Sequence, residues 1–152
     1  MLNKLNNFLA TLVPPAAADT RPEHTLQLAT AALLIEVMKS DAESTELEQA
    51  TILNILKKRF HLSDAEVAQL SQLGHSKSQA ANDLHQFTSL INRELELSDK
   101  LKIVEYLWQV AYADGKISAH ENHLMRRLVD LLHISHGDNI AAKMRAKPVG
   151  MK

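Results

Sequence analysis

An internal duplication limits the fold of this chain more than any other feature of its sequence. Segment 37–48 recurs 73 positions later as segment 110–121, and an aspartate, a hydroxyl residue and a glutamate coincide in the two copies. After the loss of one residue, segment 60–63 also matches segment 132–135. Each copy therefore predicts a long helix, a tight acidic turn, a second helix, a short connection and a third helix. Two such units can bury their apolar faces against each other, so we expect a pseudo-twofold relation between them.

Apolar residues recur at helical spacing along almost the whole chain, and no alternating stretch is long enough for a convincing strand. The 152 residues include only 4 glycines, 4 prolines and 4% aromatic residues, which favours helices over a many-turned β fold. The sequence therefore predicts one all-α bundle of about seven to eight helices built from two pseudo-twofold-related helical units. Its expected parts are an amphipathic N-terminal helix and linker (1–19), a helical domain (20–147) with internal units at about 26–73 and 98–146, and a tail (148–152).

Several helix starts are marked by their capping residues. Three pairs fit the capping box, in which a hydroxyl and a carboxylate satisfy free backbone N–H groups reciprocally, and a fourth pair has a shorter acidic arm. The three are Thr45 with Glu48, Ser63 with Glu66 and Ser118 with Glu121, and the fourth is Ser135 with Asp138. Segment 26–38 has only Gln27 and Glu36 as strongly polar side chains, so its helix is expected at the centre of the bundle. His61 and His133 occupy equivalent places and are expected at helix C-termini.

The second acidic turn resembles half of a calcium-binding loop. An EF-hand loop takes oxygen ligands from alternating positions and ends on a glutamate. Asp114 and Glu121 fit the middle and the end of such a loop. Val110 and Tyr112, however, stand at its first two ligand positions and offer no carboxylate. A complete EF-hand is therefore excluded, and the first copy departs further because Ala42 stands where the sharp turn needs glycine.

Half a loop can still bind a metal ion if the other ligands come from the second copy. The candidate ligands are Asp41 and Glu48 from one turn and Asp114 and Glu121 from the other, with Glu43 and Glu46 as accessory charges. Oxygen ligands favour calcium, magnesium or manganese over softer metals. The same residues also fit a purely structural role, because the glutamates suit helix caps and the aspartates suit helix-to-helix turns. The sequence leaves both interpretations open.

Histidines are the other candidates for chemistry. His120 and His123 lie three positions apart on a predicted helix, a spacing at which two imidazoles can share a metal ion. They are accessory candidates, and ordinary surface histidines are the alternative, because no H-E-x-x-H or Cys/His finger pattern is present. The sequence also lacks G-x-S-x-G, Walker and G-x-G-x-x-G motifs. We therefore expect no catalytic residues and no enzyme activity.

The charge balance and the cysteine count exclude several classes of protein. With 17 basic and 18 acidic residues, the net charge of −1 offers no general attraction to nucleic acid. The chain has no cysteine, which excludes disulfides and thiolate metal sites. No apolar run reaches the ~20 residues that a membrane span needs, and segment 1–13 is too polar for a secretory signal. We expect a cytoplasmic protein with no integral membrane association.

Segment 112–121, Tyr-Ala-Asp-Gly-Lys-Ile-Ser-Ala-His-Glu, is followed by an amphipathic helix and resembles the signature of the TerB-like family (tellurite resistance protein B-like helical domain). The resemblance covers roughly residues 25–145, and only the second copy matches closely. It implies an all-helical bundle and a non-enzymatic role in bacterial stress response. It also implies that the acidic turns chelate metal, which by position assigns this role to Asp41, Glu48, Asp114 and Glu121.

The leading hypothesis is a non-enzymatic stress-response module that binds a divalent cation through its two acidic turns. The alternative is a metal-free helical module for protein–protein interaction, which would keep its partner binding after Asp41→Asn and Asp114→Asn together. Both hypotheses expect a protein partner.

Overall fold

The computed structural model describes residues 7, 22–39, 41, 45–75, 80–113 and 119–147, with side chains described for 7, 23–39, 41, 45–75, 84–113 and 122–147. Within this part of the chain there are seven helices and no strand, so the predicted all-α class is confirmed. The helices are α2 (Pro22–Lys39), α3 (Glu46–Phe60), α4 (Asp64–His75), α5 (Ala80–Glu94), α6 (Leu97–Ala113), α7 (Ala119–Leu131) and α8 (His136–Ala146). The predicted N-terminal helix and the C-terminal tail lie outside the described residues, and the predicted domain boundaries stay a prediction.

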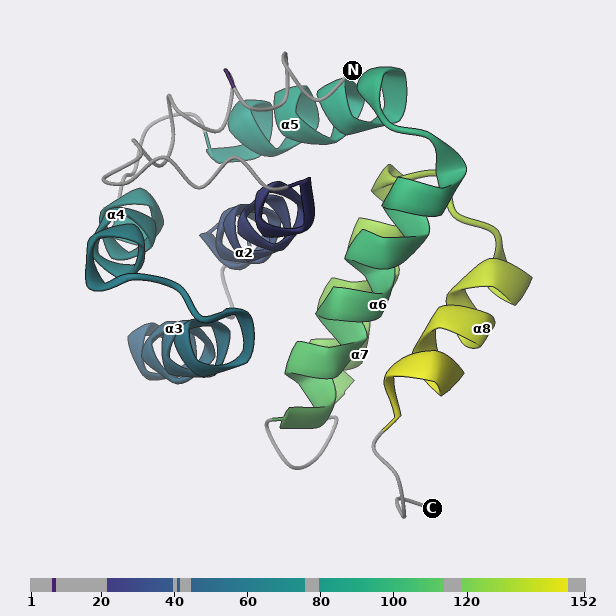
Figure 1. Ribbon diagram of the computed structural model, residues 1–152. Coiled ribbons are helices and arrows are strands. Elements are labelled where there is room, and N and C mark those ends of the chain that lie inside the picture. The colour runs from purple at the N-terminus through teal and green to yellow at the C-terminus, as the bar shows by residue number, and fades with distance from the viewer. Residues whose placement is uncertain are drawn as a thin grey trace.

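Helix α2 is the centre of the bundle, as its scarcity of polar residues predicts. Every residue from 29 to 38 is buried. The helix packs against α3, α4, α5, α6 and α7, and Figure 1 shows it end on, with α3 and α4 on one side and α6 and α7 on the other. Its buried Glu36 forms an ion pair with Lys39 one turn later, at 3.0 Å between Oε1 and Nζ. A carboxylate enclosed on all sides needs such a partner because burial of a lone charge is very costly.

The core joins the helices through large apolar side chains. The largest fully buried ones are Phe60, Phe87, Leu33, Ile35, Leu56, Leu70, Leu84, Ile91, Ile103, Leu107 and Leu128. Each such side chain contributes about 1.5–3 kcal/mol when it leaves water. Phe60 of α3 also meets Tyr106 of α6 edge to face, with ring centroids 5.4 Å apart. Because these residues come from α2 to α7, one core holds the two halves of the sequence together.

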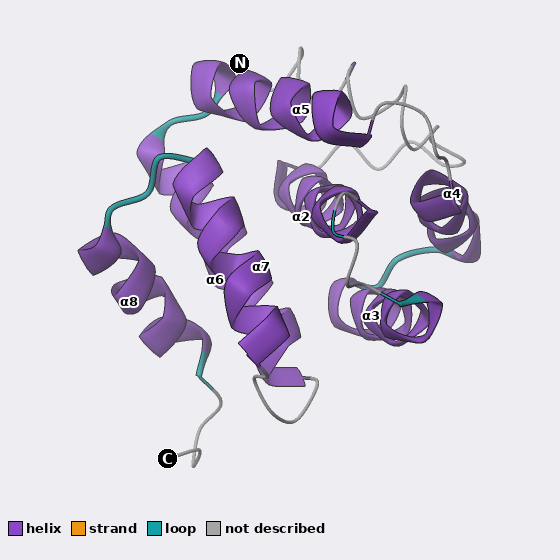
Figure 2. Cartoon of the chain, turned by 180° about the vertical axis from the view of Figure 1, so that it is seen from behind, coloured by secondary structure: helices purple, strands orange, loops and turns teal. Residues whose placement is uncertain are grey.

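Helix α8 is attached to the outer side of α6, away from α3 and α4 (Figures 1 and 2). The indole Nε1 of Trp108 donates a hydrogen bond to Asn139 Oδ1 at 2.9 Å. The ammonium of Lys143 lies 4.8 Å from the centroid of the same ring, within range of a cation–π interaction. Arg145 adds an ion pair to Glu105. These contacts fix α8 on a face of α6 that α2 does not use.

The predicted N-caps are observed wherever they fall in the described residues. At α4 the capping box is complete, since Glu66 N–H donates to Ser63 Oγ at 3.1 Å and Ser63 N–H donates to Glu66 Oε1 at 2.9 Å. Thr45 and Ser135 each accept a hydrogen bond at 3.1 Å from the backbone N–H three residues on. The box predicted at Ser118 lies outside the described residues.

The two equivalent histidines end equivalent helices in the same way. His61 has φ of 52° and His133 has φ of 57°, so both adopt the left-handed conformation that commonly ends a helix. In each case the next residue donates its N–H to a carbonyl five positions earlier, at 3.1 Å. The predicted location of both histidines at helix C-termini is therefore confirmed.

Candidate functional site

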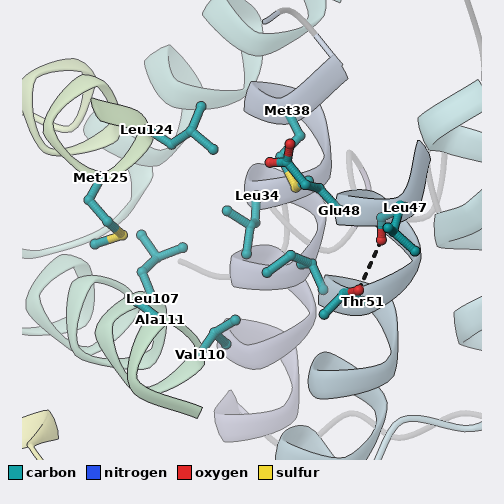
Figure 3. A pocket seen from close by; sticks show the side chains of 11 residues that line it. Leu34, Met38, Leu47, Glu48, Thr51, Leu107, Val110, Ala111, Leu124 and Met125 are labelled. Atoms are coloured by element: carbon teal, nitrogen blue, oxygen red, sulfur yellow. Dashed lines mark hydrogen bonds between the residues drawn. The ribbon is translucent and has the colours of Figure 1, made fainter. Parts of the chain in front are cut away.

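A pocket of about 230 Å³ lies between α2, α3, α6 and α7. Its walls come from the last two turns of α2 and α6 and from the first turns of α3 and α7, which are the helix ends next to the two acidic turns. Figure 3 shows Met38 and Glu48 on one side of it and Leu124 and Met125 on the other. The lining residues are Leu34, Met38, Leu47, Glu48, Thr51, Ile52, Leu107, Val110, Ala111, Leu124 and Met125.

Both of the predicted repeat units contribute residues to this pocket. Four pairs of lining residues stand 73 positions apart, which is the spacing of the two acidic turns. The pairs are Leu34 with Leu107, Met38 with Ala111, Thr51 with Leu124, and Ile52 with Met125. The ends of α2 and α6 and the beginnings of α3 and α7 therefore meet around one space.

Glu48 is the only ionisable side chain among the described residues of this lining. It is half-buried, and the start of α3 sets its position: its N–H donates to Thr45 Oγ1 at 3.1 Å, and the Thr45 hydroxyl approaches Glu48 Oε1 at 3.4 Å. The hydroxyl of Thr51 donates to the carbonyl of Leu47 at 2.9 Å, so its proton is already used inside α3. The pocket thus combines an apolar surface with a carboxylate, which suits an apolar group and a positive charge.

The first acidic turn begins directly beyond the pocket. Asp41 is half-buried, and its N–H donates to the carbonyl of Met38, a pocket residue, at 3.1 Å. Asp41 lies three positions after Met38, just as Asp114 lies three positions after Ala111. The backbone of α2 therefore links the first candidate ligand to the pocket.

The other candidate residues are placed as follows. Glu46 is exposed in the first turn of α3, and His123 is exposed on α7. Glu121 and His120 belong to the first turn of α7, but their side chains lie outside the described residues. Glu43 and Asp114 lie outside them altogether. The described residues contain no group of three or more histidines and carboxylates placed for a metal ion, and the side chains of two of the four predicted ligands, Asp114 and Glu121, are not described.

The apolar walls of the pocket were not identified from the sequence. Leu34, Leu107 and Leu124 belong to apolar stripes that predict buried helix faces, and a stripe has the same pattern whether it packs fully or borders a space. The available signal was the duplication itself, because an apolar residue at the same place in both copies is expected near the contact between them.

A comparison with known protein families identifies the family of this chain. The family described as "Tellurite resistance protein TerB" matches residues 27–144. The chain belongs to the TerB family. The match extends from α2 to α8 and so includes both acidic turns and the pocket between them. Neither the comparison with curated proteins nor the comparison with solved structures finds a match for this TerB-family chain. None of its described helices is long and apolar enough to cross a membrane.

Proposed function

We propose that this TerB-family chain is a non-enzymatic stress-response module that binds one divalent cation between its two acidic turns. The ligands are Asp41 and Glu48 from the first copy and Asp114 and Glu121 from the second. Calcium, magnesium or manganese fits this all-oxygen set. We further propose that the protein is cytoplasmic and acts by binding a partner protein.

The observation that carries the proposal is the pocket lined by repeat-equivalent residues. A shared lining with a spacing of 73 supports a pseudo-twofold relation between the copies, with the axis near the pocket. Glu121 stands 73 positions after Glu48, so the proposal gives both glutamates the same role. Asp41 and Asp114 each follow a pocket residue, Met38 or Ala111, by three positions, and the proposal gives them equivalent roles as well.

The physical role of the cation follows from this arrangement. Four carboxylates near one axis repel one another, and a divalent ion neutralises half of that charge while joining the two copies. Binding to the native form alone stabilises it by about 2.7 kcal/mol at a hundredfold excess over Kd, which corresponds to a rise in Tm of about 5–10 °C for a chain of this size.

The second candidate function is the metal-free interaction module. The apolar pocket favours it, because an open apolar recess of this size is suited to a partner's side chain. In that case the carboxylates serve as helix caps and turn residues, and partner binding survives Asp41→Asn with Asp114→Asn.

Isothermal titration of calcium, magnesium, manganese and zinc into chelator-treated protein tests the cation proposal. The variants are Asp41→Asn/Glu48→Gln and Asp114→Asn/Glu121→Gln, in which glutamine still fits a capping box. The matched control, Glu96→Gln/Asp130→Asn, removes two exposed carboxylates elsewhere. Binding by wild type and control that both ligand variants lose supports the proposal. Absence of binding by wild type to about 1 mM would reject it in favour of the metal-free module.

A further inference from the structure

We propose that the pocket between α2, α3, α6 and α7 is the anchor site for a basic segment of a partner polypeptide. One large apolar side chain of that segment enters the pocket, and a neighbouring lysine or arginine pairs with Glu48. This inference rests on the interaction role named above and concerns the cation-free chain, because a cation on Glu48 would occupy the carboxylate with which the basic residue pairs.

The volume of the pocket matches one large side chain. A cavity of about 150 Å³ is enough to hold benzene. The 230 Å³ of this open pocket therefore accommodates a phenyl or an indole group, and it is too small for two such groups. Aromatic side chains in fitted pockets are the typical anchors of protein interfaces.

The surroundings of the pocket extend this apolar surface outward. Leu47 is 78% exposed and stands in the first turn of α3 beside Glu48. An exposed leucine next to an open pocket adds contact area for the residues that flank the anchor.

Charge selects a basic segment rather than an acidic one. Glu48 contributes a carboxylate to the lining, and Glu46 is exposed in the same helical turn. The described residues of the lining include no lysine, arginine or histidine. A lysine or arginine near the anchor therefore meets an opposite charge, whereas an aspartate or glutamate in that place is repelled.

The NMR signals of methionine methyl groups can report peptide binding at the pocket. Met38 and Met125 line it from opposite walls, while Met144 is 61% exposed on α8 and lines no part of it. We would label the methionine methyl groups of the full chain with ¹³C and titrate it, with chelator present, with three capped peptides. The peptides are Ac-Lys-Trp-Lys-NH2, Ac-Glu-Trp-Glu-NH2 and Ac-Lys-Ser-Lys-NH2.

The expected result is a saturable shift of the Met38 and Met125 signals with Ac-Lys-Trp-Lys-NH2, at a Kd of about 1 mM, as befits so small a ligand. The other two peptides should bind at least about tenfold more weakly, because one lacks the opposite charge and the other lacks the anchor. The Met144 signal should not move.

Two variants separate the charge from the apolar contact. Glu48→Gln keeps the capping role and should weaken binding by about threefold to tenfold, whereas Glu46→Gln removes an equal charge outside the lining and should change it less than about twofold. Ala111→Leu narrows the pocket and should abolish the shift. If Ala111→Leu fails to fold, the pair of glutamate variants still decides the question.

Several results would overturn the inference. Equal affinity for the acidic and basic peptides would show that Glu48 does not select a basic residue. If the Met38 and Met125 signals do not shift at about 20 mM peptide, the pocket does not bind an indole group with the affinity expected for an anchor site. Shifts of these two signals on raising the protein concentration without peptide would assign the pocket to a second copy of the chain. Since no cation is present, these outcomes do not depend on the calorimetric test of cation binding.

Discussion

The ion pair between Glu36 and Lys39 of the central helix α2 should contribute strongly to the free energy of unfolding of the bundle. The two side chains are 0% and 6% exposed, and their charged atoms are 3.0 Å apart. At an effective dielectric constant of about 20, charges at that separation attract by about 5–6 kcal/mol before desolvation is subtracted. Breaking a buried ion pair by removing one partner typically costs about 3–5 kcal/mol. Lys39→Met, which keeps the length of the side chain, should therefore remove a large part of the stability of a domain this size.

The assay is urea unfolding followed by the fluorescence of Trp108, the single tryptophan of the chain and 4% exposed. The double variant Glu36→Met/Lys39→Met removes both charges and should be markedly more stable than Lys39→Met, because an apolar pair can replace a buried ion pair at little cost. Lys58→Met makes the same change at an exposed site of α3 and should alter stability by less than about 0.5 kcal/mol. If Lys39→Met loses less than about 1 kcal/mol at an unchanged m-value, the ion pair is not a major source of the stability of the bundle.

Thr45→Ala should cost about 1 kcal/mol in urea unfolding by removing the N-cap of α3, whereas Thr45→Ser should be nearly neutral; equal losses would argue against capping. The hydrogen bond from Lys57 and then its charge lower the pKa of Asp64, so the stabilisation this pair gives is present above the ordinary pKa of an aspartate and is lost as pH falls through the folded-state value. NMR titration should show the pKa of Asp64 rising in Lys57→Ala, and an unchanged midpoint would refute the pairing. Burial, and then the charges of nearby glutamates including Glu23, raise the pKa of Tyr106, so its contribution to stability is complete below pH ~10 and is lost as pH rises through the folded-state pKa. Glu23→Gln should lower the pKa of Tyr106 in an ultraviolet titration of a Tyr112→Phe background, and a rise would contradict the assignment.

The fold was predictable from the sequence because local signals agreed with one another. Capping residues placed the starts of α3, α4 and α8, and the apolar character of segment 26–38 placed α2 at the centre. The left-handed geometry of His61 and His133 matches their equivalent places in the two copies. These signals depend on neighbours within a few residues, which a sequence shows directly.

The candidate site was predictable only in part. The acidic turns were visible as a repeated pattern, and Asp41 and Glu48 do lie beside one pocket. The pocket itself depends on how well side chains from four helices fill the space between them. At one wall Ala111 supplies a single methyl group where its repeat equivalent Met38 has a long side chain. The apolar periodicity of a sequence shows which residues face the core but not whether their side chains fill the space.

A single cation that binds between the two acidic turns, next to the pocket, would lie near a methionine from each copy. Manganese is paramagnetic and broadens the signals of nearby nuclei, so ¹³C-methyl methionine spectra recorded with increasing manganese detect such a cation. We predict that Met38, from the first copy, and Met125, from the second, broaden together, that Met144 on α8 broadens far less, and that calcium reverses the effect. Broadening of only one of the two pocket methionines, or equal broadening of all three, would contradict a single cation shared by both acidic turns.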